Sequence, residues 1–444
     1  MPELRLGFRG CSAAPIWSRA LKHMTYARSM TSHSESSHVH YNHTDACQFT
    51  RWNARESYHF MYAARSWKKV NDFYSQLVLG NVSFSDIFKT PMHIVHHEAD
   101  LLDTSVQTES TTSPTIKRTG RWARVTFKIV LSYNGGSFDG WQKQPGLNTV
   151  QGSVERSLGK FIDEKKLLLL KDKGLPIEGC VVVAGRTDKG VAAYQQVCSF
   201  FTWRKDIKAE DIEEAVNDAE PGKLRVISVS EVSRAFHPNF SAKWRRYIYV
   251  FPLNTEKEES SQHEDTVDDV FDGGKRNVDD VYMALENPDV LADNYSSETR
   301  NVKKSNGFSV KKVDLLLRQL EGKLLSYKMF ARDTKASRNI GPPTECFLFH
   351  ARATEVRLIS DAEDQEGTEA MCIELVANRF LRKMVRVLVA TAIREAAAGA
   401  EDDALVKLVD ATCRRATAPP APADGLCLFD VGYTDFNPKV CLIL

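Results

Sequence analysis

Hydrophobic and polar positions first alternate with the two-residue period of a β-strand at residues 125–133. Asn134, Gly135 and Gly136 follow, so we expect a half-buried strand that ends in this turn. Similar runs rich in β-branched and aromatic residues predict further strands at 180–184, 194–203, 224–232, 240–252, 346–358, 369–377 and 426–433.

Other segments place their apolar residues at helical spacing. Thr149 is a good N-cap for a helix whose Val154, Leu158 and Phe161 share one face. A helix over 380–397 is expected to turn its apolar stripe to the core. The stripe leaves four cations to point elsewhere, namely Arg379, Arg382, Lys383 and Arg386. Shorter helices are expected at 211–219, 311–325 and 402–412, so strands and helices interleave from residue 124 onward.

Three segments depart from this rhythm. Residues 1–30 hold five bases and one acid among serines, which is typical of an organelle transit peptide. We interpret residues 31–123 as an N-terminal extension, partly disordered, with an aromatic-rich and helical part at about 52–88. Residues 254–300 hold 14 acids against four bases and predict an acidic disordered insertion. Two ordered regions remain, at 124–253 and 301–444.

Composition narrows the class of protein. With 444 residues and 42% hydrophobic content the chain can bury a sizeable core, and no apolar run reaches the roughly 18 residues of a membrane span. Nine cysteines without a C-x-x-C pair argue against a disulfide framework or a zinc ribbon and predict reduced intracellular thiols. The net charge is only +1, but the acids are concentrated in a few segments. The remaining body is therefore basic, as binding to a polyphosphate requires.

The first candidate for chemistry is the hexapeptide from Gly185 to Gly190, which follows the predicted strand at 180–184. Its glycines predict a sharp loop that presents Asp188 at the mouth of a strand. An aspartate in such a turn more often caps its own backbone. The hexapeptide alone leaves both interpretations open.

Two other residues allow the same two interpretations. Tyr247 could stack on a nucleobase or pack in the core, and Arg386 could hold a carboxylate ionised or form a surface ion pair. Carboxylate, aromatic and arginine together suit a nucleotide flipped out of its stack. The sequence contains no metal-ligand spacing, no Ser-His-Asp arrangement and no phosphate-binding Gly-Lys-Ser/Thr loop, so it gives little support to metal-dependent hydrolysis or phosphoryl transfer.

Six motifs in order resemble the TruA-type tRNA pseudouridine synthases between Arg124 and Tyr433. They read YNGGSFDGWQ at 133–142, AGRTDKGV at 184–191, FHPNFSA at 236–242, RRYIY at 245–249, FLRKMVR at 380–386, and APP at 418–420 with GL at 425–426. Six motifs in register make the functional interpretations of Asp188 and Tyr247 the better ones.

The resemblance implies an α+β fold in which two related halves surround a continuous, mixed and mainly antiparallel sheet with flanking helices. Residues 124–253 and 301–444 would be these halves of the catalytic domain. It further implies an enzyme that isomerises uridine to pseudouridine without cofactor or metal, acting on the anticodon arm of tRNA. The alternative is an inactive homologue that binds or folds tRNA.

By the resemblance, Asp188 attacks the flipped uridine or removes a sugar proton, Tyr247 stacks on the base and assists proton removal at C5, Arg186 displaces and holds the nucleotide, and Arg386 pairs with Asp188. RNA contacts are expected from Lys243, Arg245, Arg246, His237, Arg382 and Lys383.

The sequence departs from the family at Arg379, where Gly is common, and at 324–328, which matches a family motif only loosely. These departures affect local fit and RNA selection rather than the chemistry. We expect tRNA as the partner and no association with a membrane. We expect the protein in a plastid or mitochondrion rather than in the cytoplasm or nucleus. The choice of uridines and the homodimer that relatives often form stay open.

Overall fold

The computed structural model of the protein describes residues 52, 54–63, 65–88, 124–175, 177, 179–253, 307–332, 343–358, 367–411 and 416–444. The predicted transit peptide at 1–30 and the predicted acidic insertion at 254–300 lie outside these residues. Within the described part of the chain, no helix combines the length and apolar character needed to cross a bilayer.

A nine-stranded sheet organises the described residues, in the order β4-β1-β3-β9-β5-β8-β7-β6 with β2 paired to β3. Its strands are β1 (Val125–Tyr133), β2 (Val182–Val183), β3 (Ala192–Thr202), β4 (Leu224–Val232), β5 (Trp244–Pro252), β6 (Leu324–Ser326), β7 (Glu345–Leu358), β8 (Thr368–Ala377) and β9 (Leu426–Gly432). The pair β3 and β9 is parallel, and the other pairs are antiparallel. The sheet is thus mixed and mainly antiparallel, and the expected α+β fold is confirmed.

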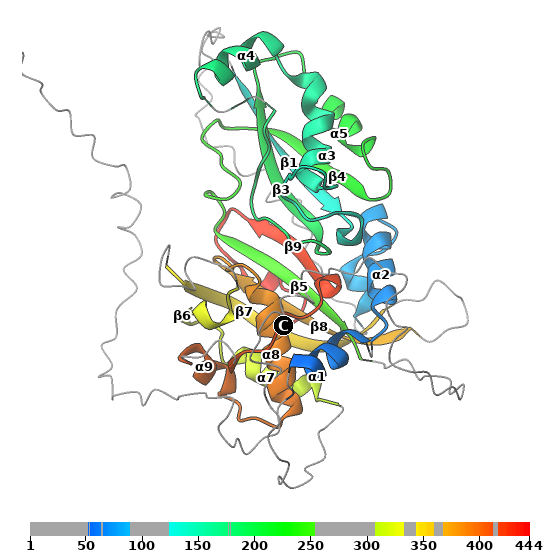
Figure 1. The fold of residues 1–444 in the computed structure, drawn as a ribbon, viewed down its shortest axis with the longest axis vertical. Coiled ribbons are helices and arrows are strands. Elements are labelled where there is room, and N and C mark those ends of the chain that lie inside the picture. Colours follow the sequence, from blue (N-terminus) through cyan, green and yellow to red (C-terminus); the bar gives the residue numbers. More distant parts are fainter. Residues whose placement is uncertain are drawn as a thin grey trace, which may run out of the picture. The chain divides into compact units, whose positions relative to one another are not determined.

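The sheet has two groups of strands with β9 between them. β9 pairs with β5 from Trp244 to Tyr249, but with β3 only at Ala192 and Ala193. Figure 1 shows β5 and β9 running between the β1, β3, β4 group and the β7, β8 group. A single short parallel contact therefore joins the two groups near the start of β3.

Alternate residues of β5 enter two different cores, as the pleat of a strand requires. Tyr247 and Tyr249 point into the larger core, which most of the helices cover, while Ile248 and Val250 point into a smaller one. The helices on the larger core are α3 (Val150–Leu158), α5 (Ala209–Asn217), α7 (Val310–Arg318), α8 (Met384–Ala397) and α9 (Ala404–Val409).

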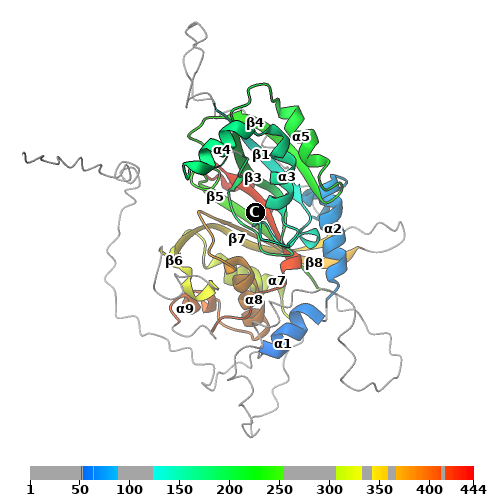
Figure 2. The same cartoon turned by 45° about the horizontal axis from the view of Figure 1, so that its top comes forward.

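The smaller core is covered by α2 (Trp67–Leu79) and a 3-10 turn at Phe84–Ile87, both within the N-terminal extension. A glycine in the left-handed conformation, Gly80 at φ 86°, ends α2 as a C-cap. Figure 2 shows α2 alongside both groups of strands, and α2 packs on β1, β3, β4, β5 and β7. The remaining helices are α1 (Ala54–Tyr58) and α4 (Glu164–Asp172).

Several predicted boundaries need correction. β1 is buried on both faces rather than half-buried, because Thr126, Val130 and Ser132 are also covered. The predicted buried strand at 180–184 is only the pair β2, whose Val182 is 41% exposed. The predicted strand at 240–252 begins at Trp244, and the helix expected from Phe380 begins at Met384.

Candidate active site

Asp188 lies in the loop between β2 and β3, immediately before the short contact of β3 with β9. This position is where the two groups of strands join, so residues from both halves of the chain can reach it. The Asp188 side chain is 32% exposed, which leaves the carboxylate accessible to a ligand.

Hydrogen bonds from β1 and β3 hold the loop in one conformation. The Tyr133 hydroxyl lies 2.8 Å from Thr187 Oγ1, and Gln196 Nε2 donates to the Gly185 carbonyl at 2.7 Å. Trp141 N donates to the Thr187 carbonyl at 3.1 Å. Burial raises the pKa of Tyr133, so its hydroxyl stays protonated. The backbone on both sides of Asp188 is therefore fixed before any ligand binds.

The glycine-rich turn after β1 packs directly against this loop. A Cβ on Gly135 would lie 2.3 Å from the Val191 carbonyl carbon and 2.4 Å from the Gly190 oxygen. Gly140 has φ +96°, and its Cβ would meet the backbone of residues 187–189 at 3.1–3.3 Å. Only residues without side chains fit, which explains in physical terms why the motif at 133–142 accompanies the loop motif.

Arg386 approaches Asp188 from the first turn of α8. Its Nη1 lies 3.8 Å from Asp188 Oδ2, and its Nε donates to the Ala421 carbonyl at 2.6 Å. The Arg386 side chain is only 1% exposed, so the surface ion pair considered from the sequence is replaced by a buried one. The expectation that α8 turns its cations away from the core is wrong for Arg386, because the helix is buried on all sides from Met384 to Ala396.

Tyr247 reaches the same site from β5, the strand beside β9. Its hydroxyl lies 3.9 Å from the point where a Cβ on Gly185 would stand. Its ring packs edge-on against Phe380, with ring centroids 5.1 Å apart. Burial raises the pKa of Tyr247 to about 12, and the charge of Arg245 opposes that rise.

The structure thus brings Asp188, Tyr247 and Arg386 together, with Arg186 on the exposed side of the loop. Of the residues expected to contact RNA, Lys243 and Arg382 are exposed. Lys243 pairs with Asp435 at 2.8 Å. His237 and Lys383 are half-buried, and Lys383 has a left-handed backbone with φ 59° at the start of α8.

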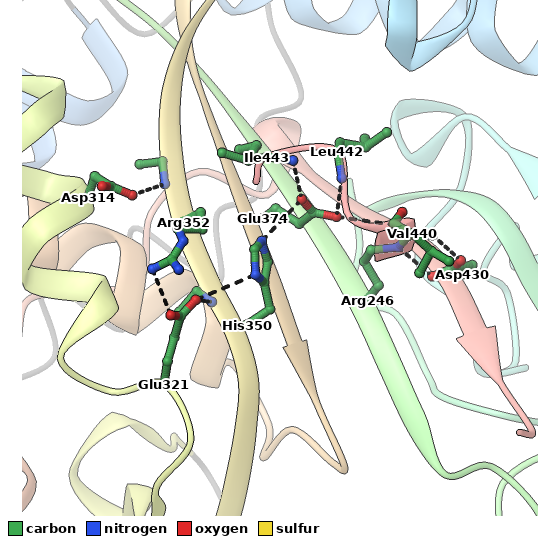
Figure 3. A network of polar contacts seen from close by, with 12 residues as sticks. Arg246, Asp314, Glu321, His350, Arg352, Glu374, Asp430, Val440, Leu442 and Ile443 are labelled. Atoms are coloured by element: carbon green, nitrogen blue, oxygen red, sulfur yellow. Dashed lines mark hydrogen bonds and ion pairs between the residues drawn. The ribbon is translucent and has the colours of Figure 1, made fainter. Parts of the chain in front are cut away.

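Arg246 is placed differently from the expectation. Its side chain is 4% exposed and faces the smaller core, opposite to Tyr247, with its guanidinium 4.3 Å from the Phe429 ring. It bonds to Asp430 and Glu374 (Figure 3). A guanidinium buried and paired on the far face of β5 is not available to phosphate, so the expectation that Arg246 binds RNA is corrected.

Arg245 points to the site but bonds to protein. Its Nη2 donates to the carbonyls of Ala184 and Asn239 at 2.9 and 3.1 Å, and its Nη1 to that of Asn378 at 3.1 Å. Burial lowers its pKa, and the side chain is 8% exposed. Arg245 therefore joins three segments around Asp188 rather than contacting RNA. The sequence motif marked the residue but not this role.

One cluster in the described part of the chain has metal-ligand chemistry. His350, Glu374 and Cys441 offer ligand atoms within 4.8 Å of one another. The oxygens of Glu374 already accept from Arg246, from Leu442 N at 3.1 Å and from Ile443 N at 2.8 Å (Figure 3). The neighbouring guanidinium would also repel a dication. We interpret the cluster as a clamp that holds the C-terminal residues on the sheet.

The sheet of two joined strand groups, with a carboxylate loop at their junction and residues of both groups around it, is consistent with the α+β fold of a pseudouridine synthase. Comparison with known proteins agrees. A family model described as tRNA pseudouridine synthase matches residues 338–434, the stretch that contains Arg386.

Curated relatives extend the match. The chain is 40% identical over 134 residues to tRNA pseudouridine synthase A of Dictyoglomus thermophilum, covering 30% of this chain and 49% of that protein. It is 38% identical over 122 residues to tRNA pseudouridine synthase A of Solibacter usitatus, covering 28% of this chain and 45% of that protein. The chain thus spans about half the length of these two relatives. For the protein of the same name from Pelodictyon phaeoclathratiforme, 26% identity over 308 residues covers 69% of this chain and 98% of that protein. The chain is thus similar to proteins named tRNA pseudouridine synthase A over about two thirds of its length.

Proposed function

We propose that the protein is a tRNA pseudouridine synthase that isomerises uridine in the anticodon arm. The observation that carries the proposal is the buried Arg386 cation 3.8 Å from the accessible Asp188 carboxylate. The cation orients the carboxylate while leaving it open to a ligand, as a nucleophile or a base requires.

The reaction breaks the bond between N1 of uracil and C1′ of ribose, turns the base, and joins C5 to C1′. The proton on C5 leaves and N1 gains one, so the product is an isomer. Asp188 either attacks the nucleotide or removes a sugar proton to start the cleavage. Arg386 holds the carboxylate, and the exposed Arg186 holds the displaced nucleotide.

Tyr247 assists the loss of the C5 proton. With a pKa of about 12 its hydroxyl is protonated at neutral pH. It therefore takes the C5 proton only while passing its own to a neighbouring acceptor. Its ring, held edge-on by Phe380, supplies the surface on which the base stacks.

The test uses unmodified tRNA transcripts with tritium at C5 of uridine, since isomerisation releases that tritium to water. The wild-type protein should release tritium, whereas Asp188→Asn should bind tRNA and release none. A wild-type protein that binds tRNA without releasing tritium would support the alternative, an inactive homologue that binds or folds RNA.

Two finer parts of the proposal concern residues outside the described ones. Residues 1–30 would direct import into a plastid or mitochondrion. Residues 254–300 would lie away from the RNA, because their acids would repel its phosphates, and would therefore be dispensable for catalysis. A fluorescent fusion of the first segment and a deletion of the second test these points. The oligomeric state is decided by the molar mass in solution, against 50.0 kDa for one chain.

A further inference from the structure

The loop that joins β4 to β5 presents an aromatic ring to solvent. Phe240 is 77% exposed, and among the large hydrophobic side chains of the described residues it is the one exposed aromatic. Its ring lies on that of His237, with centroids 4.2 Å apart and planes at 30°. The exposed ring offers an apolar face that a ligand can cover, which would remove that face from water.

The loop holds the two rings in place. His237 Nδ1 accepts the backbone N–H groups of Asn239 and Phe240, both at 3.2 Å. His237 N donates to Ser241 Oγ at 3.1 Å, and Ser241 N to the His237 carbonyl at 2.9 Å. The position of the exposed ring is thus set before any ligand arrives, which reduces the entropy lost on binding.

Arg245 connects this loop to Asp188. The guanidinium that bonds to the carbonyl of Asn239, the residue before Phe240, also bonds to that of Ala184, the residue before the catalytic loop. The buried Arg245 side chain therefore lies between the backbone of the loop that carries Phe240 and the backbone that leads into the loop of Asp188. A nucleic acid whose target base enters beside Asp188 has its neighbouring nucleotides near Phe240.

The charges around the ring favour nucleic acid over another class of partner. Lys243, three residues after Phe240, is exposed although it pairs with Asp435 at 2.8 Å, and Arg234 is exposed six residues before Phe240. Aromatic rings interleaved with cations are the usual means of binding single-stranded nucleic acid, because each base offers a face for stacking.

We propose that His237 and Phe240 form a stacking platform for a base that flanks the target uridine. Flipping the uridine leaves this neighbour without one stacking partner, and the platform replaces it. The inference rests on the proposed function in that it places RNA at Asp188. It adds a residue, Phe240, that the sequence interpretation had assigned to a strand.

The experiment measures binding and turnover of the full chain with anticodon-arm RNA. Phe240→Ala should raise the dissociation constant and KM about 10- to 100-fold with a smaller change in kcat. Phe240→Trp should restore both values because it keeps a stacking face. Leu168→Ala, a control at another side chain of high exposure (63%), should change neither value.

A second RNA, with an abasic site beside the target uridine, separates stacking from structural effects. Removal of the flanking base that stacks on Phe240 should weaken binding to the wild-type protein. It should not further weaken binding to Phe240→Ala. Equal penalties in the two proteins, for an abasic site on either side, would overturn the platform. Unchanged RNA binding by Phe240→Ala would overturn it as well and would direct attention to a protein partner.

The two proposals fail separately. If the wild-type chain forms no pseudouridine but the coupling between Phe240 and the flanking base persists in binding, the platform stands and the proposed activity fails. If product forms and the coupling is absent, the activity stands and the platform fails.

Discussion

Arg386 Nη1 lies 3.8 Å from Asp188 Oδ2, although one residue is on a buried helix of the second half of the chain and the other on a loop of the first half. The guanidinium is held from behind by the Ala421 carbonyl at 2.6 Å. A charge buried and aimed in this way needs little reorganisation during the reaction.

Replacing Arg386 by Lys should lower kcat about 100-fold while leaving the tRNA dissociation constant unchanged. Lysine keeps the charge but cannot bond to Ala421 and reach Asp188 at once. The matched control is Arg394→Lys, also buried on α8, whose bonds go to Glu395 and the Ala416 carbonyl. Steady-state kinetics measure kcat, and equal losses in both variants would assign Arg386 a structural role only.

Removing the hydroxyl of Tyr247 should impair turnover without weakening tRNA binding. Since burial raises the pKa of Tyr247 to about 12, the wild-type rate should show no loss from ionisation of this residue below about pH 11. Tyr247→Phe should give a lower pH–rate profile of the same shape over that range. Tyr249→Phe, which loses a bond to the Pro422 carbonyl on the same face of β5, should retain the wild-type rate. A change of the wild-type rate with pH near neutrality that is absent from Tyr247→Phe would contradict this account.

Adjacent glycines after β1 should respond differently to alanine. Gly135→Ala places a Cβ 2.3 Å from the Val191 backbone, so unfolding free energy should fall by about 1–3 kcal/mol and turnover should fall as the Asp188 loop shifts. Gly136→Ala meets only the Asn134 Oδ1 atom, at 3.4 Å, and should change stability by about 0.5 kcal/mol or less. Chemical denaturation and tritium release measure the two effects, and similar outcomes for both variants would refute the close-contact argument.

The buried carboxylate of Glu374 should make stability depend on pH. Burial raises its pKa, but the contact with His350, whose Nε2 lies 3.4 Å from the carboxylate, and the charge of Arg246 more than offset this, so the pKa in the folded protein is lowered. Its contribution is therefore complete above about pH 5 and is lost as pH falls through the folded-state pKa. Glu374→Gln should cost about 3–5 kcal/mol at pH 7, and the difference from wild type should shrink in acid.

The control for this prediction is Glu369→Gln on the same strand, where the carboxylate is 55% exposed and lies 3.7 Å from Arg357. An exposed pair of this kind contributes about 1 kcal/mol or less. Denaturation across pH measures both variants. A Glu374→Gln deficit that stays constant down to strongly acid pH would show that packing, not charge, carries the effect.

The sequence alone was sufficient wherever local physics decides the outcome. The strand at 224–232 and the cap at Thr149, whose side chain accepts from Gly152 N, follow from alternation and from the hydrogen-bonding needs of a helix start. The candidate residues Asp188, Tyr247 and Arg386 came from ordered motifs, and their roles stay predictions until they are measured. The α+β fold followed from the resemblance and is confirmed.

Tertiary structure alone decided what surrounds each side chain. Arg245 and Arg246 are neighbours with the same chemistry, yet the pleat of β5 turns one to the Asp188 loop and the other to the buried pair of Glu374 and Asp430. α4 was not predicted because its four consecutive leucines show no helical spacing, and the structure buries none of its residues. The sequence shows the two-residue period of a strand. It does not show which face of the strand meets the site, because that depends on segments distant along the chain.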